Sequence, residues 1–345
     1  MKIKQKIIIG ICAVFASLLA SCSPEENIVN AGEEYWTLLT VFSATNEIQN
    51  AKIQNAAIES KSIRYTANNA IESIFEYRNY LFLMMPESNK MEILDRATYQ
   101  LLTVVDFSQS KRKPCAIAFA NATTAYIAQR NDSVVTIYDL QNFKIAGDIP
   151  VGKNPIAIHA GIGDRQNQIF VANYSSNTVS QIDSRLNRVV ALYDVIAGPR
   201  FIENDPTGTK MVVACEGAGK HGGIAKPSMP GMAFIDIDRK LILAQTTIST
   251  RKSDSAEAYP LGLAVTKSEW AFVPMSNGLL RVDTREYKNY STISQNVYSW
   301  ISFNQRRNEL IFCKDNEVSI INENSGVLKH APIVLEKPVL CAIGQ

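Results

Sequence analysis

The residues best suited to chemistry lie in one glycine-rich segment, Cys215 to Gly231 (CEGAGKHGGIAKPSMPG). It holds five glycines together with the basic or titratable side chains of Lys220, His221 and Lys226. Glycines let a backbone approach a ligand closely, and the neighbouring side chains can donate hydrogen bonds to it. A phosphate-binding P-loop is excluded, because the pattern GxxxxGK[ST] is absent. The segment is interpreted as a ligand-binding loop, with a plain surface insertion as the alternative.

A second long segment, Thr247 to Pro260, brings an aromatic residue to its end. Tyrosine, tryptophan and arginine side chains suit the recognition of ligands and partners. We therefore predict a ligand-binding set, and structural packing remains the alternative for each member. The set consists of Arg130, Tyr174, Arg200, Lys220, His221, Tyr259 and Trp300.

Other chemistry-bearing residues favour structural roles. A short polar residue recurs at Asp95, Asp139, Asp183, Asp236, Asp283 and Asn322. Four of these aspartates precede a hairpin, where a carboxylate can accept hydrogen bonds from amides two residues later, and no DxDxDG calcium loop is present. The three histidines are scattered, and GxSxG, HExxH and CxxCH are absent. No catalytic residue, metal or cofactor is predicted.

The spacing of this recurring polar residue indicates the elements that position the candidate site. The intervals are 44, 44, 53, 47 and 39 residues, and short runs of Val, Ile, Leu, Tyr and Phe lie between them. Such intervals are typical of four-stranded propeller blades, and such runs are typical of strands. Each unit opens with a further strand, in most units after a proline such as Pro155, Pro199 or Pro260. Six such units fit between about Ala70 and Leu335.

The two chain ends supply the missing blade. Tyr35 to Thr66 contains three strands without a first one, and KPVLCAIGQ at the C-terminus contains one lone strand. Joining them closes the ring and removes exposed strand edges. We therefore predict an all-β fold: a seven-bladed β-propeller of four-stranded antiparallel blades, closed by the C-terminal strand in the N-terminal blade. Both long segments then lie on one face of the ring.

The segments VANYSSNTVSQIDSRLNRVVA and IAQRNDSVVTIYDLQNFKIAGDIPVGKNPIAI carry a family resemblance. They resemble the repeats of YVTN-type propellers, also called surface-layer or YncE-like propellers. The resemblance covers most of the chain after Ala70 and implies the fold. It implies little about activity, because propellers host many unrelated functions.

The N-terminus indicates secretion and lipid anchoring. Three lysines precede the apolar run IIIGICAVFASLLA, and LASC resembles a lipobox that ends at Cys22. An ordinary cleavable signal is the alternative. The expected organisation is a lipoprotein signal peptide at 1–21, a lipidated tether at 22–34 and the propeller at 35–345. The residues after Cys22 loosely resemble the export signal of Bacteroidetes surface lipoproteins, which implies an outer-membrane location facing outward.

Composition limits the partners. Lys plus Arg number 35 against 33 for Asp plus Glu, so no bulk charge drives binding to nucleic acid. The four cysteines of the mature chain are Cys115, Cys215, Cys313 and Cys341. They are interpreted as buried thiols that replace small apolar residues, with a Cys313–Cys341 disulfide left open.

Three functions are weighed. The first is a non-enzymatic binding propeller, because some gut Bacteroidetes lipoproteins of the resembling family capture cobalamin for a TonB-dependent transporter. The ligand here would be cobalamin or another nutrient, and the partners a transporter and the membrane. The second is a propeller-type enzyme (hydrolase, lyase or quinone-dependent oxidoreductase) with its site at the channel mouth. The third is an adhesion scaffold.

Overall fold

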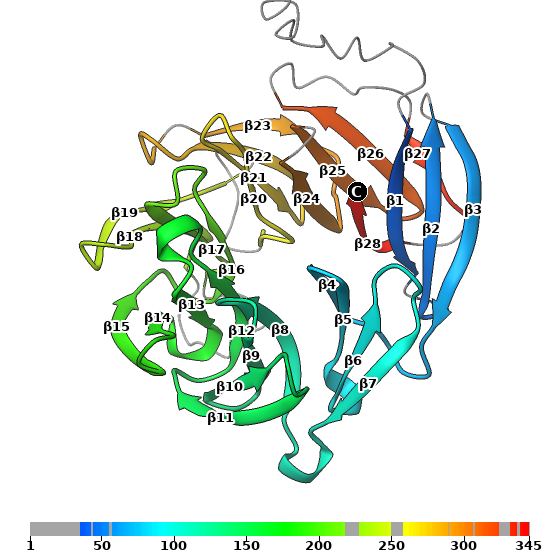
Figure 1. Ribbon diagram of the computed structural model, residues 1–345. Coiled ribbons are helices and arrows are strands. Elements are labelled where there is room, and N and C mark those ends of the chain that lie inside the picture. Colours follow the sequence, from blue (N-terminus) through cyan, green and yellow to red (C-terminus); the bar gives the residue numbers. More distant parts are fainter. Residues whose placement is uncertain are drawn as a thin grey trace, which may run out of the picture. The chain divides into compact units, whose positions relative to one another are not determined.

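The computed structural model describes residues 35–345, except 43, 55–56, 218–227, 250–257, 289, 306–307, 324–331, 337–338 and 345. Seven four-stranded antiparallel sheets form a seven-bladed β-propeller in this part of the chain (Figure 1). The fold class predicted from the sequence is therefore confirmed. Within the described residues, no helix has the length and apolar character needed to cross a bilayer.

The blades are numbered along the chain, and each is given from its first, central strand outward. Blades 1 to 3 are β28 (Val339–Gly344), β1 (Tyr35–Phe42), β2 (Glu47–Gln54), β3 (Ala57–Thr66); β4 (Ser73–Tyr77), β5 (Tyr80–Met85), β6 (Lys90–Asp95), β7 (Leu101–Asp106); and β8 (Lys113–Phe119), β9 (Thr124–Arg130), β10 (Val134–Asp139), β11 (Lys144–Pro150). Blades 4 and 5 are β12 (Pro155–Ala160), β13 (Gln168–Asn173), β14 (Thr178–Asp183), β15 (Arg188–Asp194); and β16 (Pro199–Asn204), β17 (Lys210–Cys215), β18 (Gly231–Asp236), β19 (Leu241–Thr247). Blades 6 and 7 are β20 (Ala264–Val265), β21 (Trp270–Met275), β22 (Gly278–Asp283), β23 (Tyr290–Ser294); and β24 (Trp300–Asn304), β25 (Glu309–Lys314), β26 (Glu317–Asn322), β27 (Ile333–Val334). Short 3-10 turns occur at η1 (Pro86–Ser88), η2 (Ser108–Ser110), η3 (Gly163–Arg165) and η4 (Tyr174–Ser176).

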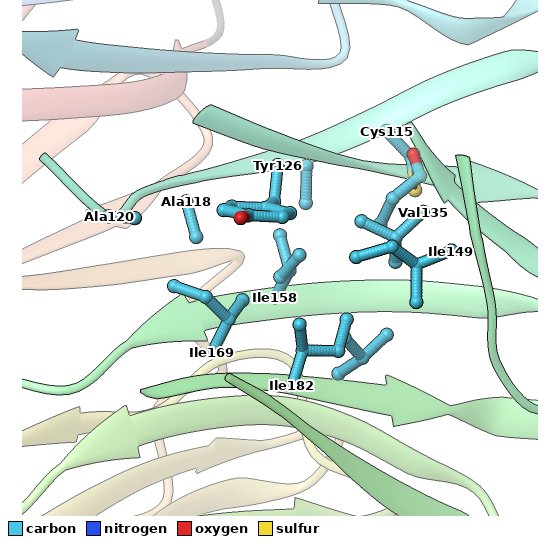
Figure 2. Close-up of a cluster of buried hydrophobic side chains, with 12 residues drawn as sticks. Cys115, Ala118, Ala120, Tyr126, Val135, Ile149, Ile158, Ile169 and Ile182 are labelled. Carbon is cyan, nitrogen blue, oxygen red and sulfur yellow. Dashed lines mark hydrogen bonds between the residues drawn. The ribbon is translucent and has the colours of Figure 1, made fainter. Parts of the chain in front are cut away.

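Apolar packing between neighbouring blades holds the ring together. The buried apolar side chains of the described residues form seven clusters, one at each of the seven junctions between neighbouring blades. Figure 2 shows the cluster between blades 3 and 4, where Tyr126 of β9 meets Ile158 of β12 and Ile169 of β13. Each blade thus buries both of its faces, which explains why the second strands are almost continuously apolar.

The last strand closes the ring. β28 pairs antiparallel with β1, in a register that sets Leu38 opposite Gly344 and Val41 opposite Cys341. Leu38 and Phe42 pack with Ile311 and Ile320 of blade 7. The predicted closure of the N-terminal blade by the C-terminal strand is therefore confirmed.

The recurring aspartates build the hairpins between third and fourth strands. Asp95 Oδ1 accepts hydrogen bonds from the amides of Ala97 and Thr98 at 3.0 and 2.8 Å. These amides lower the pKa of Asp95, together with the Thr98 hydroxyl. The same turn is made by Asp139, Asp183, Asp236 and Asp283. The predicted turn role is confirmed.

Blade 6 departs from the predicted pattern. A first strand was expected from Pro260 onward, but β20 contains only two residues, and Pro260 forms an isolated bridge to Met275. The cause is Pro274 in β21. Its carbonyl accepts a hydrogen bond from Leu261, but proline has no N–H to donate back, so the ladder is interrupted there.

The cysteines behave as small apolar residues where they are described. Cys115 and Cys215 are buried free thiols, and Cys313 is buried between blades 7 and 1. Burial raises the pKa of Cys115 to about 12, so this thiol stays protonated. The side chain of Cys341 lies outside the described residues.

Candidate functional site

In blades 3, 4 and 5 the second strand ends at the face that carries the two long segments, and it pairs there with the first strand in the same register. Pro114, Pro155 and Pro199 pair with Gln129, Asn173 and Cys215, respectively. The next residue of each second strand or its loop is therefore equivalent in the three blades. These equivalent residues are Arg130, Tyr174 and Glu216.

A β-bulge sets the position of Arg200. The ladder between β16 and β17 passes from the pair Pro199–Cys215 to the pair Phe201–Ala214, so Arg200 is left without a partner. The same bulge follows the proline in blades 3 and 4, where Cys115 and Ile156 are skipped. Bulges redirect side chains and are common beside functional sites. Of the three bulges, only that of blade 5 carries a charged residue.

The redirected arginine meets a buried carboxylate. Arg200 Nη1 donates a hydrogen bond to Glu216 Oε2 at 3.0 Å, and the Tyr174 hydroxyl donates to the same oxygen at 3.0 Å. The side chain of Glu216 is only 2% exposed, whereas that of Arg200 is 33% exposed. Within the described residues, the buried Oε1 atom of Glu216 has no hydrogen-bond partner. This pair and Tyr174 join blade 4 to blade 5.

The backbone around Gly198 holds the carboxylate in place. The amides of Glu216 and Gly217 donate to the carbonyls of Gly198 and Ala197 at 2.7 and 2.9 Å. Gly198 has φ +64°, and a Cβ there would lie 3.2 Å from Glu216 Cβ and from Tyr174 Cε2. A larger residue at Gly198 would therefore be strained and would press on both side chains.

Aromatic rings flank the guanidinium. The central carbon of Arg200 lies 5.9 Å from the ring centre of Tyr259 and 5.6 Å from that of Phe201. Burial and the Glu216 carboxylate raise the pKa of Tyr174 to about 12. Tyr174 therefore keeps its proton at neutral pH. The outcome is a partly exposed arginine whose guanidinium is held by a buried carboxylate and flanked by aromatic rings. We call this group the Arg200 site (Tyr174, Arg200, Phe201, Glu216 and Tyr259).

The predicted ligand-binding residues fall into separate groups. Arg200, Tyr174 and Tyr259 come together in the Arg200 site. Arg130 pairs instead with Glu72, in part through Nη1 to Oε2 at 2.7 Å, and so joins blades 2 and 3. Trp300 packs against the apolar clusters on both sides of blade 1. Lys220, His221 and Cys22 lie outside the described residues.

His159 forms a second polar contact between blades 4 and 5. Its Nε2 lies 3.1 Å from Glu203 Oε2, and Asn204 Nδ2 donates to the Ala160 carbonyl at 2.7 Å beside it. Burial disfavours the imidazolium, but the Glu203 carboxylate outweighs this effect and raises the pKa of His159 above 6.5. Within the described residues, no three His, Cys, Asp or Glu side chains are grouped so as to hold a metal ion.

The His159–Glu203 pair predicts a pH-dependent stability. A raised pKa in the folded state stabilises the fold fully below pH 6.5, and this contribution is lost as pH rises through the folded-state pKa. Both side chains are about a third exposed, so the contribution is about 0.5 kcal/mol. Urea unfolding at pH 5.5 and 8.5 should show this loss in the wild type and not in the E203Q variant. Equal pH dependence in both proteins would contradict the prediction.

Comparisons with known proteins bear on the fold. No protein-family model and no curated protein matches the sequence. Among solved structures, a protein of Bacteroides uniformis ATCC 8492, assigned provisionally as a 6-phosphogluconolactonase, is similar with a TM-score of 0.66 and 14% identity. The alignment covers 90% of this chain and 99% of that one. At this identity the likeness supports the propeller fold alone.

A second solved structure is more distant. Hydrazine synthase of Kuenenia stuttgartiensis has a TM-score of 0.48 and 15% identity, over 72% of this chain and 93% of that one. Likeness at this level carries no argument about the site.

Sequence reasoning did not single out Glu216 or Glu72. Both pair with arginines that the sequence did indicate, Arg200 and Arg130. The available signal was position, because Glu216 directly follows the apolar run Met211 to Cys215 of its second strand. Arg130 and Tyr174 stand at the same place in the two preceding blades. A carboxylate at that place needs a partner, because an unpaired buried charge is costly.

Proposed function

We propose that this protein is a non-enzymatic binding propeller that captures a ligand at the Arg200 site, on the face formed by the second-to-third-strand and blade-to-blade loops. The observation that carries the proposal is the partly exposed side chain of Arg200, whose guanidinium is fixed by buried Glu216 and flanked by aromatic rings. A preorganised donor beside rings suits binding, because little entropy is lost when the ligand arrives. Tyr174, with its pKa near 12, is poorly suited to act as a base at neutral pH.

The proposal includes a cellular setting. The lipobox-like LASC would place acyl chains on Cys22 and hold the propeller on the outer surface of the outer membrane. There it would pass its ligand to a TonB-dependent transporter, as the resemblance to YVTN-type lipoproteins suggests. Cobalamin or another nutrient is the proposed cargo. The provisional assignment of the Bacteroides uniformis neighbour belongs to that protein.

The test has two parts. Radiolabelled palmitate should label the full chain and not the C22S variant, and a wild-type chain free of acyl label would overturn the anchoring. For binding, a soluble form lacking residues 1–22 is titrated calorimetrically with cobalamin, haem and glycans. We expect one of these classes to bind. No binding by any of them, with no transporter co-purifying, would overturn capture.

A Y259A variant locates the binding. Loss of the ring beside Arg200 should weaken affinity about tenfold, since aromatic anchors dominate binding energies. The matched control is R165A, which removes an arginine paired with Asp238 at 2.8 Å on the opposite face. Equal affinity of the Y259A variant and the wild type would place the ligand elsewhere.

A further inference from the structure

The Arg200 site exposes a cationic group but holds no net charge among the described residues. Arg200 contributes one positive charge and Glu216 one negative charge, and their atoms lie 3.0 Å apart. Tyr174 stays neutral, because its pKa is about 12. The pair therefore attracts an anion far less than a lone arginine would, since the two opposite charges largely cancel beyond their own separation.

The hydrogen-bonding capacity of the site is nevertheless open. Among the described residues, Nη1 of Arg200 has a hydrogen-bond partner, whereas Nε and Nη2 have none. An arginine carries five N–H donors in a plane, so donors remain for an acceptor outside the protein. Because Glu216 is buried and a third of the Arg200 side chain is exposed, the arginine and not the carboxylate is accessible from solvent.

The rings of Tyr259 and Phe201 add an apolar, planar component. Their centres lie 5.9 and 5.6 Å from the guanidinium carbon. Such an arrangement accommodates a flat group that stacks on a ring while its oxygen accepts from the guanidinium. An ionised ligand would in addition lose its hydration against a carboxylate that already uses the arginine charge.

From these observations we propose that Glu216 sets the charge selectivity of the site: it makes Arg200 a donor for an uncharged, planar, carbonyl-bearing ligand such as an amide, and disfavours the corresponding anion. This inference rests on the proposed function, because it assumes that ligands bind at the Arg200 site. It assigns Glu216 the role of a positioning and specificity-determining residue.

The test compares two probes of the same shape, nicotinamide and nicotinate, by saturation-transfer NMR on the soluble form. The wild type should bind nicotinamide at least about fivefold more tightly than nicotinate. The E216Q variant keeps one side-chain oxygen, which can accept from both Arg200 and Tyr174 as Glu216 Oε2 does, but leaves the arginine charge uncompensated. It should therefore bind nicotinate about five- to tenfold more tightly than the wild type does, with little change for nicotinamide.

The D238N variant is the matched control, since it removes one negative charge on the opposite face. It should leave the ratio of the two affinities unchanged. A wild type that prefers nicotinate, or an E216Q variant with the wild-type ratio, would overturn the inference. A wild type that binds neither nicotinamide nor nicotinate would overturn it as well.

Two further readouts keep the outcomes distinct. Nicotinamide binding to the wild type should not change between 50 and 500 mM salt, which tests the inference even if the E216Q variant fails to fold. Where cobalamin, haem or a glycan binds in a Tyr259-dependent manner but the probes fail, the charge-selectivity inference is wrong and capture at this face stands. Where nothing binds, both fail.

Discussion

Removal of residues 339–345 is expected to abolish cooperative folding of the propeller. This segment contains β28, which forms five register pairs with β1 and hence about five backbone hydrogen bonds, and each lost bond costs about 1 kcal/mol. The total of about 5 kcal/mol is comparable to the whole stability of many domains. The loss would also leave β1 as an open edge and expose Leu38 and Phe42, which are buried between blades 1 and 7.

Circular dichroism and thermal unfolding of the truncated chain check this prediction. The control is a chain that lacks Gln345 alone, which should unfold like the wild type. Adding the peptide VLCAIGQ in trans should restore part of the transition, because it can pair with β1 as the missing strand. A truncated chain with a wild-type melting temperature would show that closure contributes little.

The architecture could be predicted because successive units carry the same kinds of residues at the same structural positions. Each unit needs a turn residue before its last hairpin, so Asp95, Asp139 and Asp183 mark the blades at intervals that only a propeller explains well. The lone strand at the C-terminus was then expected to pair with the first strand of the N-terminal blade, since a ring of sheets without it would leave that edge unpaired. Local chemistry and closure together determined the seven blades.

Details within blades depended on single residues. The shortened β20 follows from Pro274, which stands in the neighbouring strand and not in β20 itself. Its effect becomes visible only once the register between β20 and β21 is known, because only then is it clear on which side the missing N–H lies. The bulge at Arg200 likewise becomes visible only in the pairing of β16 with β17.

The candidate site was partly predictable for a similar reason. Arg200, Tyr174 and Tyr259 were selected by residue type and by the face on which they lie, and the structure brings these three together. Arg130 and Trp300 satisfied the same criteria but lie at other blade junctions. Residue type does not reveal which blade neighbour a side chain meets, so the sequence could not separate the two groups.

The R200A variant is expected to lose about 2–3 kcal/mol of unfolding free energy. Removing one partner of a fully buried ion pair costs roughly 3–5 kcal/mol, because the other charge stays buried without compensation. The cost is lower here because a third of the Arg200 side chain already meets water, whereas Glu216 is 2% exposed. Chemical unfolding monitored by tryptophan fluorescence measures the loss. The R165A control, at an exposed pair, should cost no more than about 1 kcal/mol.

A double variant separates stability from function. Replacing both members of a buried ion pair by apolar residues is often neutral or stabilising. R200M combined with E216L should therefore recover part of the stability that R200A loses, but not all of it, because the Tyr174 hydroxyl loses its acceptor. The same double variant should bind ligand no better than R200A, because it has no guanidinium to donate hydrogen bonds. Recovery of stability without binding would mean that the pair is retained for recognition. A double variant as unstable as R200A would instead indicate that the fold itself needs the charge pair at this junction of blades 4 and 5.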